Sequence, residues 1–366
     1  MRSETVFLDK EQIYKTTKSY FKGLLKVVSD SLGGIKISIA NIVLFSKQYT
    51  KFCKIRLLGI PIYCKDLRKK WIKRILQNVD NKYDDIYLIR YNVGETVVVL
   101  SCVQHILRFY KSKNPLFIVF RRKDMSLYSM FLTQIKVPFQ LIELTRREIY
   151  EIYDLEDKPY KIGSQRLIAP IKKISEQMMR DIRKGKDSNF YDFIIHSIGI
   201  SKSEPMVMPC PSIKAINKVD QMNLKNVVIL CPEATTVQEL PISFWQELAN
   251  NLKQKGYTVF VNAFKTVNQI KNTETAKLQL DELYVLSRHA AGIITMANGI
   301  AIMMCQSAKM DIIYTPYHEN WFGYDSTNTL KTYSVKHLPN IKGDIKEYDT
   351  KSITVTELLN NILDRY

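Results

Sequence analysis

The stretch Asn226-Val-Val-Ile-Leu-Cys-Pro-Glu-Ala-Thr-Thr236 decides the fold of this 366-residue chain. A short apolar run that ends in turn residues is typical of a buried strand. It is followed by a helical pattern over 243–255, an apolar run over 256–262, a helical pattern over 280–290, the run 292–295, the turn 297–299, a third helix and the run 311–315. Short apolar strands that alternate with amphipathic helices predict a parallel sheet covered on both faces.

The same alternation occurs earlier in the chain, so the sequence predicts a second sheet of this kind. Its expected elements are strands over 85–90, 116–120 and 139–142 and helices over 96–110, over 125–134 and from 145. We therefore predict an α/β protein with two doubly wound, Rossmann-like domains and a basic, partly helical N-terminal extension. The expected boundaries are 1–75 for the extension, 76–215 for the first domain and 216–366 for the second.

Three motifs at the ends of the later strands resemble the donor-binding half of bacterial heptosyltransferases. Pro232-Glu-Ala-Thr235 stands where that family has Pro-Gly-Ala-Ser, Leu240-Pro241 stands for Trp-Pro, and Ala297-Asn298-Gly299 stands for Asp-Ser/Thr-Gly. The resemblance implies the GT-B arrangement, in which the first domain binds the acceptor and the second binds the nucleotide-sugar. It also implies that the final helix, 355–366, crosses back to brace the first domain.

A loop of the first domain contains the candidate catalytic base. Asn92-Val93-Gly94-Glu95 resembles the Gly-x-Gly-Asp loop of the same family, with Asn92 and Gly94 on the acceptor side. Gly94 permits a tight turn, and Glu95 then lies at a helix N-terminus. Glu95 is the candidate that deprotonates the acceptor hydroxyl. The alternative is that Glu95 only stabilises the start of its helix.

Donor-binding candidates cluster where the strands of the second domain end. Helix N-termini bind phosphate through free N–H groups, which makes Thr235, Thr236, Asn298 and Gly299 phosphate candidates, although each is also an ordinary residue at a helix start. Further donor candidates follow two of the strands and are Asn262, Lys265, His318 and Glu319. Of these, Lys265 would replace a lysine that the family has elsewhere, and Glu319 would bind a ribose hydroxyl.

Some positions depart from the heptosyltransferase pattern. Gln238 and Glu239 occupy the neighbourhood of the family's lysine, Ile302 stands near the position of its histidine, and Glu233 replaces a glycine. These differences speak against heptose transfer from an ADP-sugar and leave sugar transfer open. They also leave open a nucleotide-sugar 2-epimerase of the same architecture, or a catalytically inactive scaffold for glycan assembly.

The motifs that are missing exclude other classes. Without G-x-G-x-x-G an NAD enzyme is disfavoured, and without Asp-x-Asp at a strand end we expect neither a metal nor another cofactor. Six cysteines lack CxxC spacing, which indicates reduced thiols instead of a disulfide framework or a zinc site. No recognition-helix or RNA-binding motif is present, so nucleic acid is not an expected partner.

The positive charge is concentrated near the N-terminus. Residues 1–75 hold 17 Lys and Arg against 5 Asp and Glu, a net charge of +12, which leaves +6 of the total +18 for the remaining residues. Lys15, Lys18, Lys22 and Lys26 recur at helical spacing, so we expect a basic amphipathic helix. Such a helix binds an anionic membrane surface; the alternative is that it packs on the neighbouring domain.

The resemblance to heptosyltransferases implies a bacterial glycosyltransferase for surface polysaccharides. The start of the chain lacks the features of a signal peptide, and no apolar run is long enough to span a membrane. We expect a cytoplasmic enzyme, peripheral on the inner face of the membrane. It would transfer a sugar, with inversion, from a nucleotide-sugar to a lipid-linked or growing glycan of capsule, lipopolysaccharide or O-antigen.

Overall fold

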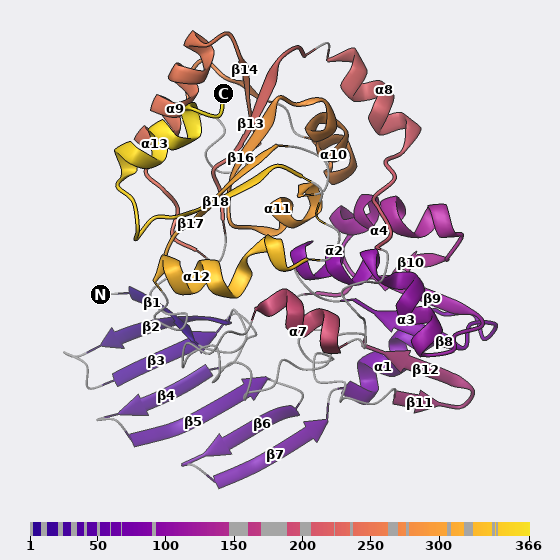
Figure 1. Ribbon diagram of the computed structural model, residues 1–366. Helices are drawn as coiled ribbons and strands as arrows, with labels where there is room; N and C mark the ends of the chain where they lie inside the picture. The colour runs from indigo at the N-terminus through magenta and orange to yellow at the C-terminus, as the bar shows by residue number, and fades with distance from the viewer. Residues whose placement is uncertain are drawn as a thin grey trace.

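The chain forms three sheets, of which two belong to α/β domains (Figure 1). The computed structural model describes residues 3–8, 13–20, 25–30, 35–39, 42–49, 52–58, 60–66, 68–89, 93–145, 160–169, 189–197, 206–222, 224–234, 237–262, 270–275, 278–305, 309–317, 325–338, 341 and 343–366.

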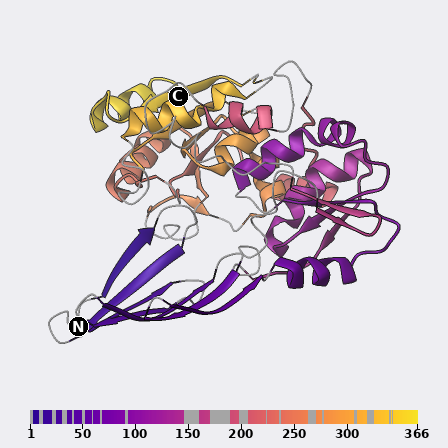
Figure 2. The ribbon, with the colours of Figure 1, turned by 90° about the horizontal axis from the view of Figure 1, so that it is seen from below.

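The N-terminal part of the chain is a seven-stranded antiparallel sheet in which each strand pairs with the next. Its strands are β1 (Ser3–Leu8), β2 (Ile13–Tyr20), β3 (Leu25–Asp30), β4 (Ile35–Ile39), β5 (Ile42–Tyr49), β6 (Phe52–Leu57) and β7 (Ile60–Asp66). Figure 2 shows this sheet extending away from the two α/β domains. The helix α1 (Arg68–Gln77) then leads into the first of them.

The basic amphipathic helix predicted from Lys15, Lys18, Lys22 and Lys26 is wrong, because Lys15 and Lys18 lie in strand β2 and Lys26 lies in β3; Lys22 lies outside the described residues. Five of the eight residues of β2 are β-branched or aromatic, a composition that favours strands. Antiparallel pairing with β1 and β3 supplies the partners that a sequence pattern does not show. The strand-like character expected around 54–62 is confirmed by β6 and β7.

The first α/β domain has the strand order β10-β9-β8-β12-β11. Its first four strands are parallel, and β11 is antiparallel to β12. The strands are β8 (Asp85–Leu88), β9 (Pro115–Val119), β10 (Phe139–Leu141), β11 (Tyr160–Ile162) and β12 (Gln165–Ile168). The helices are α2 (Val93–Ser101), α3 (Val103–Phe109), η2 (Arg122–Asp124), α4 (Met125–Leu132) and η3 (Thr133–Ile135).

Successive residues of the central strands enter different cores, as expected for a sheet covered on both faces. In β8, Ile86 packs in one cluster with Ile72 and Ile75 of α1, whereas Tyr87 belongs to the cluster on the other face, with α2, α3 and α4. The single helix predicted over 96–110 is divided at Cys102, whose N–H is shared between two carbonyls of the preceding turn.

The second α/β domain has the strand order β15-β14-β13-β16-β17-β18, with every neighbouring pair parallel. Its strands are β13 (Val227–Cys231), β14 (Thr258–Val261), β15 (Glu274–Thr275), β16 (Gly292–Met296), β17 (Met310–Tyr314) and β18 (Ile345–Asp349). Its helices are α8 (Ile213–Gln221), α9 (Ile242–Gln254), α10 (Leu280–His289), α11 (Gly299–Met304), α12 (Ser326–Tyr333), η4 (Val335–His337) and α13 (Val355–Leu363). Every residue of β13, β16 and β17 is buried, which explains their continuous apolar runs. The predicted pair of doubly wound domains is confirmed.

The final helix braces the second domain, so the expectation that it crosses to the first domain is wrong. Helix α13 packs against α9. The Lys255 ammonium donates to the Leu363 carbonyl (2.6 Å), and the Tyr366 hydroxyl donates to the buried carboxylate of Asp311 (3.0 Å). A side chain at Gly292 would collide with the Tyr366 ring. These contacts tie the end of the chain to the amino-terminal edge of its own sheet.

Helix α7 (Phe190–Ser197) joins the two α/β domains, since it packs on α2 of the first and on α12 and η4 of the second. The Asn189 side chain accepts hydrogen bonds at the start of α7 and donates to the carbonyls of Lys331 (3.2 Å) and Ser334 (3.3 Å). His337 and Asp192 form a further pair at 2.9 Å. The domains are therefore connected by directed polar contacts as well as by apolar packing.

Candidate functional site

The strand orders locate the candidate site. In the first sheet, β9 and β12 lie on opposite sides of β8; in the second, β14 and β16 lie on opposite sides of β13. Ligands of doubly wound sheets bind at the carboxyl ends of the strands, where the order reverses in this way. The chain that follows β8 forms α2, and the chain that follows β16 forms α11. These two helices lie side by side (Figure 1).

Glu95 lies in the first turn of α2, and its charge acts on tyrosines of other elements. Burial raises the pKa of Tyr191 and Tyr317 well above the ordinary value, and the Glu95 carboxylate raises both further. Tyr191 belongs to α7, whereas Tyr317 follows β17 of the second domain. The predicted base is therefore only partly exposed and lies where both α/β domains contribute side chains.

Asn298 stabilises the start of α11. Its side-chain oxygen accepts hydrogen bonds from the N–H groups of Ile300 (3.0 Å) and Ala301 (3.1 Å), and its side-chain nitrogen donates to the Glu233 carbonyl (2.9 Å). It thus links the ends of β13 and β16, the two strands at the reversal point. Asn262 is buried at the end of β14, where its backbone N–H donates to the Leu230 carbonyl (2.8 Å).

The loop after β13 is fastened to the loop after β17, a contact that the sequence pattern does not reveal. Val237 and Tyr317 form an antiparallel bridge. The Gln238 N–H donates to the Pro316 carbonyl (2.8 Å), and the Thr315 hydroxyl donates to the Gln238 carbonyl (2.5 Å). Gln238 and Thr315 therefore fix the strand-end loop that precedes α9.

Two glycines allow α2 and α11 to touch. A β-carbon at Gly299 would lie 2.7 Å from the backbone nitrogen of Gly94 and 3.0 Å from the β-carbon of Val93. A β-carbon at Gly94 would overlap the tip of Ile302. Both glycines are thus required for close packing, a role that the sequence did not predict. Phosphate binding by Asn298 and Gly299 stays a prediction. Because Gly299 packs against α2, such binding requires α2 and α11 to separate.

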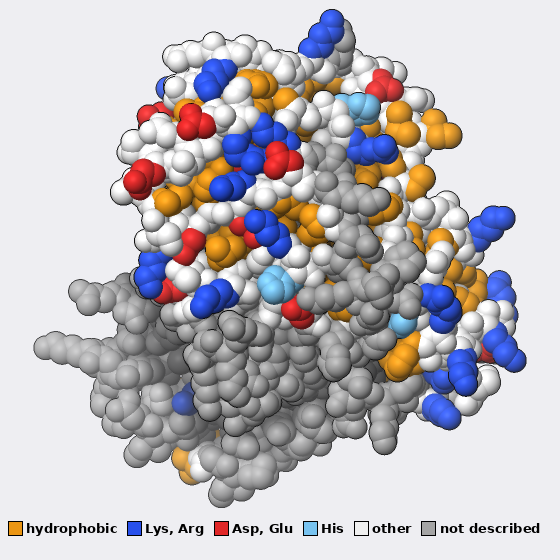
Figure 3. Space-filling model, viewed as in Figure 1, with side chains coloured by type: hydrophobic (Ala, Val, Ile, Leu, Met, Phe, Trp, Pro, Cys, Tyr) orange, Lys and Arg blue, Asp and Glu red, His pale blue; other side chains and the backbone are white. Residues whose placement is uncertain are grey.

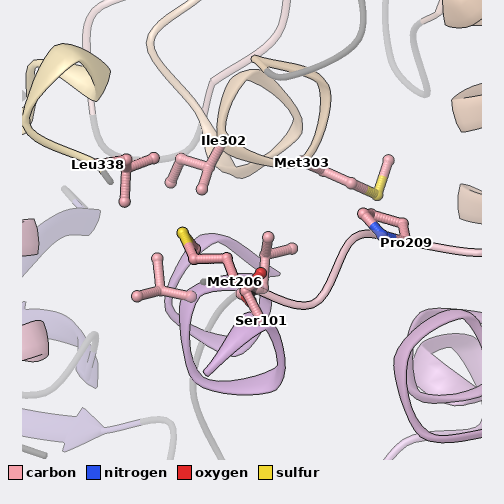
Figure 4. A pocket seen from close by; sticks show the side chains of 8 residues that line it. Ser101, Met206, Pro209, Ile302, Met303 and Leu338 are labelled. Carbon is pink, nitrogen blue, oxygen red and sulfur yellow. Dashed lines mark hydrogen bonds between the residues drawn. The ribbon is translucent and has the colours of Figure 1, made fainter. Parts of the chain in front are cut away.

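The contact between the domains is apolar and filled. We call it the α2–α11 seam, and its lining residues are Val97, Val98, Ser101, Met206, Pro209, Ile302, Met303 and Leu338. Figure 4 shows Ile302 opposite Met206 across this seam, and Met303 extending towards Pro209. The remaining space is about 10 Å³, at the lower limit for one water molecule. In this conformation the seam has no room for a nucleotide diphosphate.

Several predicted site residues lie outside the described part of the chain. They are Asn92, Thr235, Thr236, Lys265, His318 and Glu319. Within the described residues, no group of three or more His, Cys, Asp or Glu side chains could hold a metal ion, and no helix is long and apolar enough to cross a membrane. The buried thiols of Cys102, Cys231 and Cys305 have pKa values raised by burial to about 12.

The chain is similar to solved structures of glycosyltransferases. A glycosyl transferase of family 9 from Veillonella parvula matches at 10% identity over 78% of this chain and 98% of its own, with a TM-score of 0.46. The ADP-heptose heptosyltransferase II of E. coli matches at 12% identity over 77% and 98%, with a TM-score of 0.45. No family model and no curated protein matches the chain.

A third match corrects the expectation about metals. TibC of enterotoxigenic E. coli, at 14% identity over 100% of this chain and 96% of its own with a TM-score of 0.46, is described as an iron-containing dodecameric glycosyltransferase. This description contradicts the expectation, which came from the missing Asp-x-Asp motif, that this chain uses no metal. The chain resembles the heptosyltransferases in fold, and identities of this size assign neither a substrate nor an acceptor.

Proposed function

We propose that this chain is a glycosyltransferase that moves a sugar from a nucleotide-sugar to a lipid-linked or growing surface glycan. One observation carries the proposal: Glu95 lies in the first turn of α2, at the reversal point of the first sheet, and α2 packs against α11, which follows β16 at the reversal point of the second. This arrangement presents a carboxylate of the first domain to ligands held by the second. The heptosyltransferase-like motifs at the same strand ends support the proposal.

The proposed reaction is a direct displacement. The acceptor hydroxyl transfers its proton to the Glu95 carboxylate, and its oxygen forms a bond to the anomeric carbon of the donor sugar. The bond from that carbon to the phosphate oxygen breaks, and the nucleotide leaves with the bonding electrons. Attack opposite the leaving group inverts the anomeric configuration. General-base catalysis of this kind contributes about 10²- to 10⁴-fold to the rate.

Glu95→Gln tests the proposal, because the amide keeps the shape of the side chain and cannot accept the proton. We expect nucleotide release and sugar transfer to fall by about 10²- to 10⁴-fold, with donor affinity changed less than about threefold. Glu247→Gln, on the exposed face of α9, is the matched control and should retain activity. Full activity of Glu95→Gln would remove Glu95 from the mechanism.

A catalytically inactive glycan-assembly protein is the second candidate. The filled α2–α11 seam and the apolar Ile302, near the position of the family's histidine, favour it. Such a protein would bind sugar nucleotides or glycans and release no nucleotide from any donor. The same assay therefore separates the two candidates. Formation of an epimerised nucleotide-sugar without an acceptor would instead identify a 2-epimerase.

A further inference from the structure

A basic surface with an exposed aromatic ring lies at the amino-terminal edge of the first α/β sheet. We call it the α3 corner, and its residues are Arg108 and Phe109 at the end of α3, Lys111 and Lys113 in the next turn, and Lys161 of β11, all exposed. The Phe109 side chain is 55% exposed. Figure 3 shows Lys and Arg side chains gathered over this domain, at the lower right of the view.

The Phe109 ring is held on a rigid aromatic support. It stands edge-on to Tyr110 at 5.0 Å, and Tyr110 stands edge-on to Tyr87 at 6.1 Å. Tyr87 in turn stacks on the buried Phe117 at 4.7 Å. The Tyr87 hydroxyl also contacts the Ser112 hydroxyl at 2.5 Å, which anchors the turn between Lys111 and Lys113. The Phe109 ring is therefore held in place by packed aromatic side chains, while part of it is exposed to solvent.

Among the residues that the structure describes, three acidic groups at this edge of the sheet already have partners. Asp80 pairs with Lys82 at 3.2 Å, and Asp84 accepts a hydrogen bond from the Asn114 side chain at 3.2 Å. Asp85 is fully buried and receives two hydrogen bonds of 2.6 Å from Arg166. The charge that the α3 corner presents outward is therefore positive, and it surrounds an apolar ring.

We propose that the α3 corner docks on an anionic lipid surface, with Phe109 entering the head-group region and the four cations facing lipid phosphates. Peripheral proteins bind membranes through this combination of apolar insertion and basic attraction. A nucleic-acid duplex would neutralise the cations but offers no apolar layer for Phe109. The corner replaces the predicted N-terminal helix as the membrane contact.

Docking at the α3 corner leaves the candidate site open. The turn 111–114 precedes β9, whereas the site lies beyond the carboxyl ends of the strands. The five residues of β9 span about 17 Å, so the site would stand about that far from the bilayer. If the chain acts as the proposed glycosyltransferase, this separation suits an acceptor hydroxyl on an extended glycan. The docking itself does not depend on catalysis.

Flotation of the full chain with vesicles tests the docking surface. The wild-type protein should float with vesicles of phosphatidylglycerol and phosphatidylcholine and stay behind with phosphatidylcholine alone. Lys111→Glu/Lys113→Glu should weaken partition at least tenfold, since each basic residue near such a surface contributes several-fold. Phe109→Ser, which keeps the charge, should weaken it about threefold to thirtyfold. Lys111 and Lys113 are exposed, so the urea unfolding midpoint of Lys111→Glu/Lys113→Glu should match the wild type, whereas Phe109→Ser should lower the midpoint slightly because it removes the contact with Tyr110.

The control is Lys214→Glu/Lys346→Glu, which changes the net charge equally on the second domain. It should float like the wild type. Equal loss in this control would show that only net charge matters and would overturn the proposal, as would wild-type protein that fails to float. If the wild type instead binds a DNA or RNA duplex and does not float, and the Lys111→Glu/Lys113→Glu variant loses this binding, nucleic acid is the partner. That result would also overturn the proposal.

Discussion

Alanine at Gly299 tests the closest contact between the two α/β domains. The new β-carbon would lie 2.7 Å from the backbone nitrogen of Gly94 and 3.0 Å from the β-carbon of Val93. Neither atom is the end of a flexible side chain, so α2 and α11 must move apart. Overpacking of this kind costs about 1–3 kcal/mol, and alanine recovers less than about 1 kcal/mol through its helix propensity. We expect the free energy of unfolding to fall by about 1–2 kcal/mol.

Alanine at Gly94 provides the internal comparison, because its β-carbon would meet mainly the tip of the Ile302 side chain. Ile302→Val removes that tip. In the Ile302→Val background, Gly94→Ala should therefore become less destabilising by at least about 0.5 kcal/mol, whereas Gly299→Ala should keep its full effect. Urea unfolding of the single and double variants measures both couplings. A Gly299→Ala protein as stable as the wild type would show that α2 and α11 are not in contact.

Three further predictions concern the links within the structure. Asn189→Ala should lower the free energy of unfolding by about 2 kcal/mol, because it removes the side-chain cap at the start of α7 and two bridging hydrogen bonds. Asn189→Ser keeps the helix cap and should recover about half of that loss in urea titrations. Thr315→Val should weaken nucleotide-sugar binding by about fivefold to tenfold in calorimetry, because it loses a hydrogen bond of about 1 kcal/mol that fixes the loop after β13. Unchanged affinity would show that this loop is not part of the donor site. The folded thiols with pKa values of about 12 stay protonated while the unfolded thiols ionise near pH 9, so their stability contribution is complete below pH 9 and is lost as the pH rises towards 12. At pH 10 each thiol should account for a loss of stability on the order of 1 kcal/mol, and a flat profile between pH 8 and 10 would contradict their burial. These thiols are Cys102, Cys231 and Cys305.

The α/β domains were predictable because strands that are buried on both faces of a sheet have continuous apolar runs in the sequence. The run at β13 is apolar at each of its five residues, and all five are buried. The N-terminal sheet was not predictable in the same way. Lysines spaced three and four residues apart fit a helix, and they also fit two short strands whose stability depends on pairing with neighbours.

The candidate site was predictable only in part. Strand ends and helix starts can be read from a pattern, and this reasoning placed Glu95 beside the second domain. Contacts between distant segments have no local signal, so the pattern missed the link between Thr315 and Gln238 and the bridging role of Asn189. It also interpreted Gly299 as a phosphate contact, because a glycine at a helix start looks the same whether a ligand or another helix approaches it.

Calorimetric titration with a panel of UDP-, GDP-, ADP- and CMP-sugars and the corresponding free nucleotides would show whether the chain binds a nucleotide-sugar. We expect that one nucleotide class binds, that its sugar-bearing form is consumed when an acceptor glycan is present, and that Glu95→Gln still binds it without turnover. Absence of binding across the whole panel, by a protein that unfolds cooperatively, would contradict the proposed function.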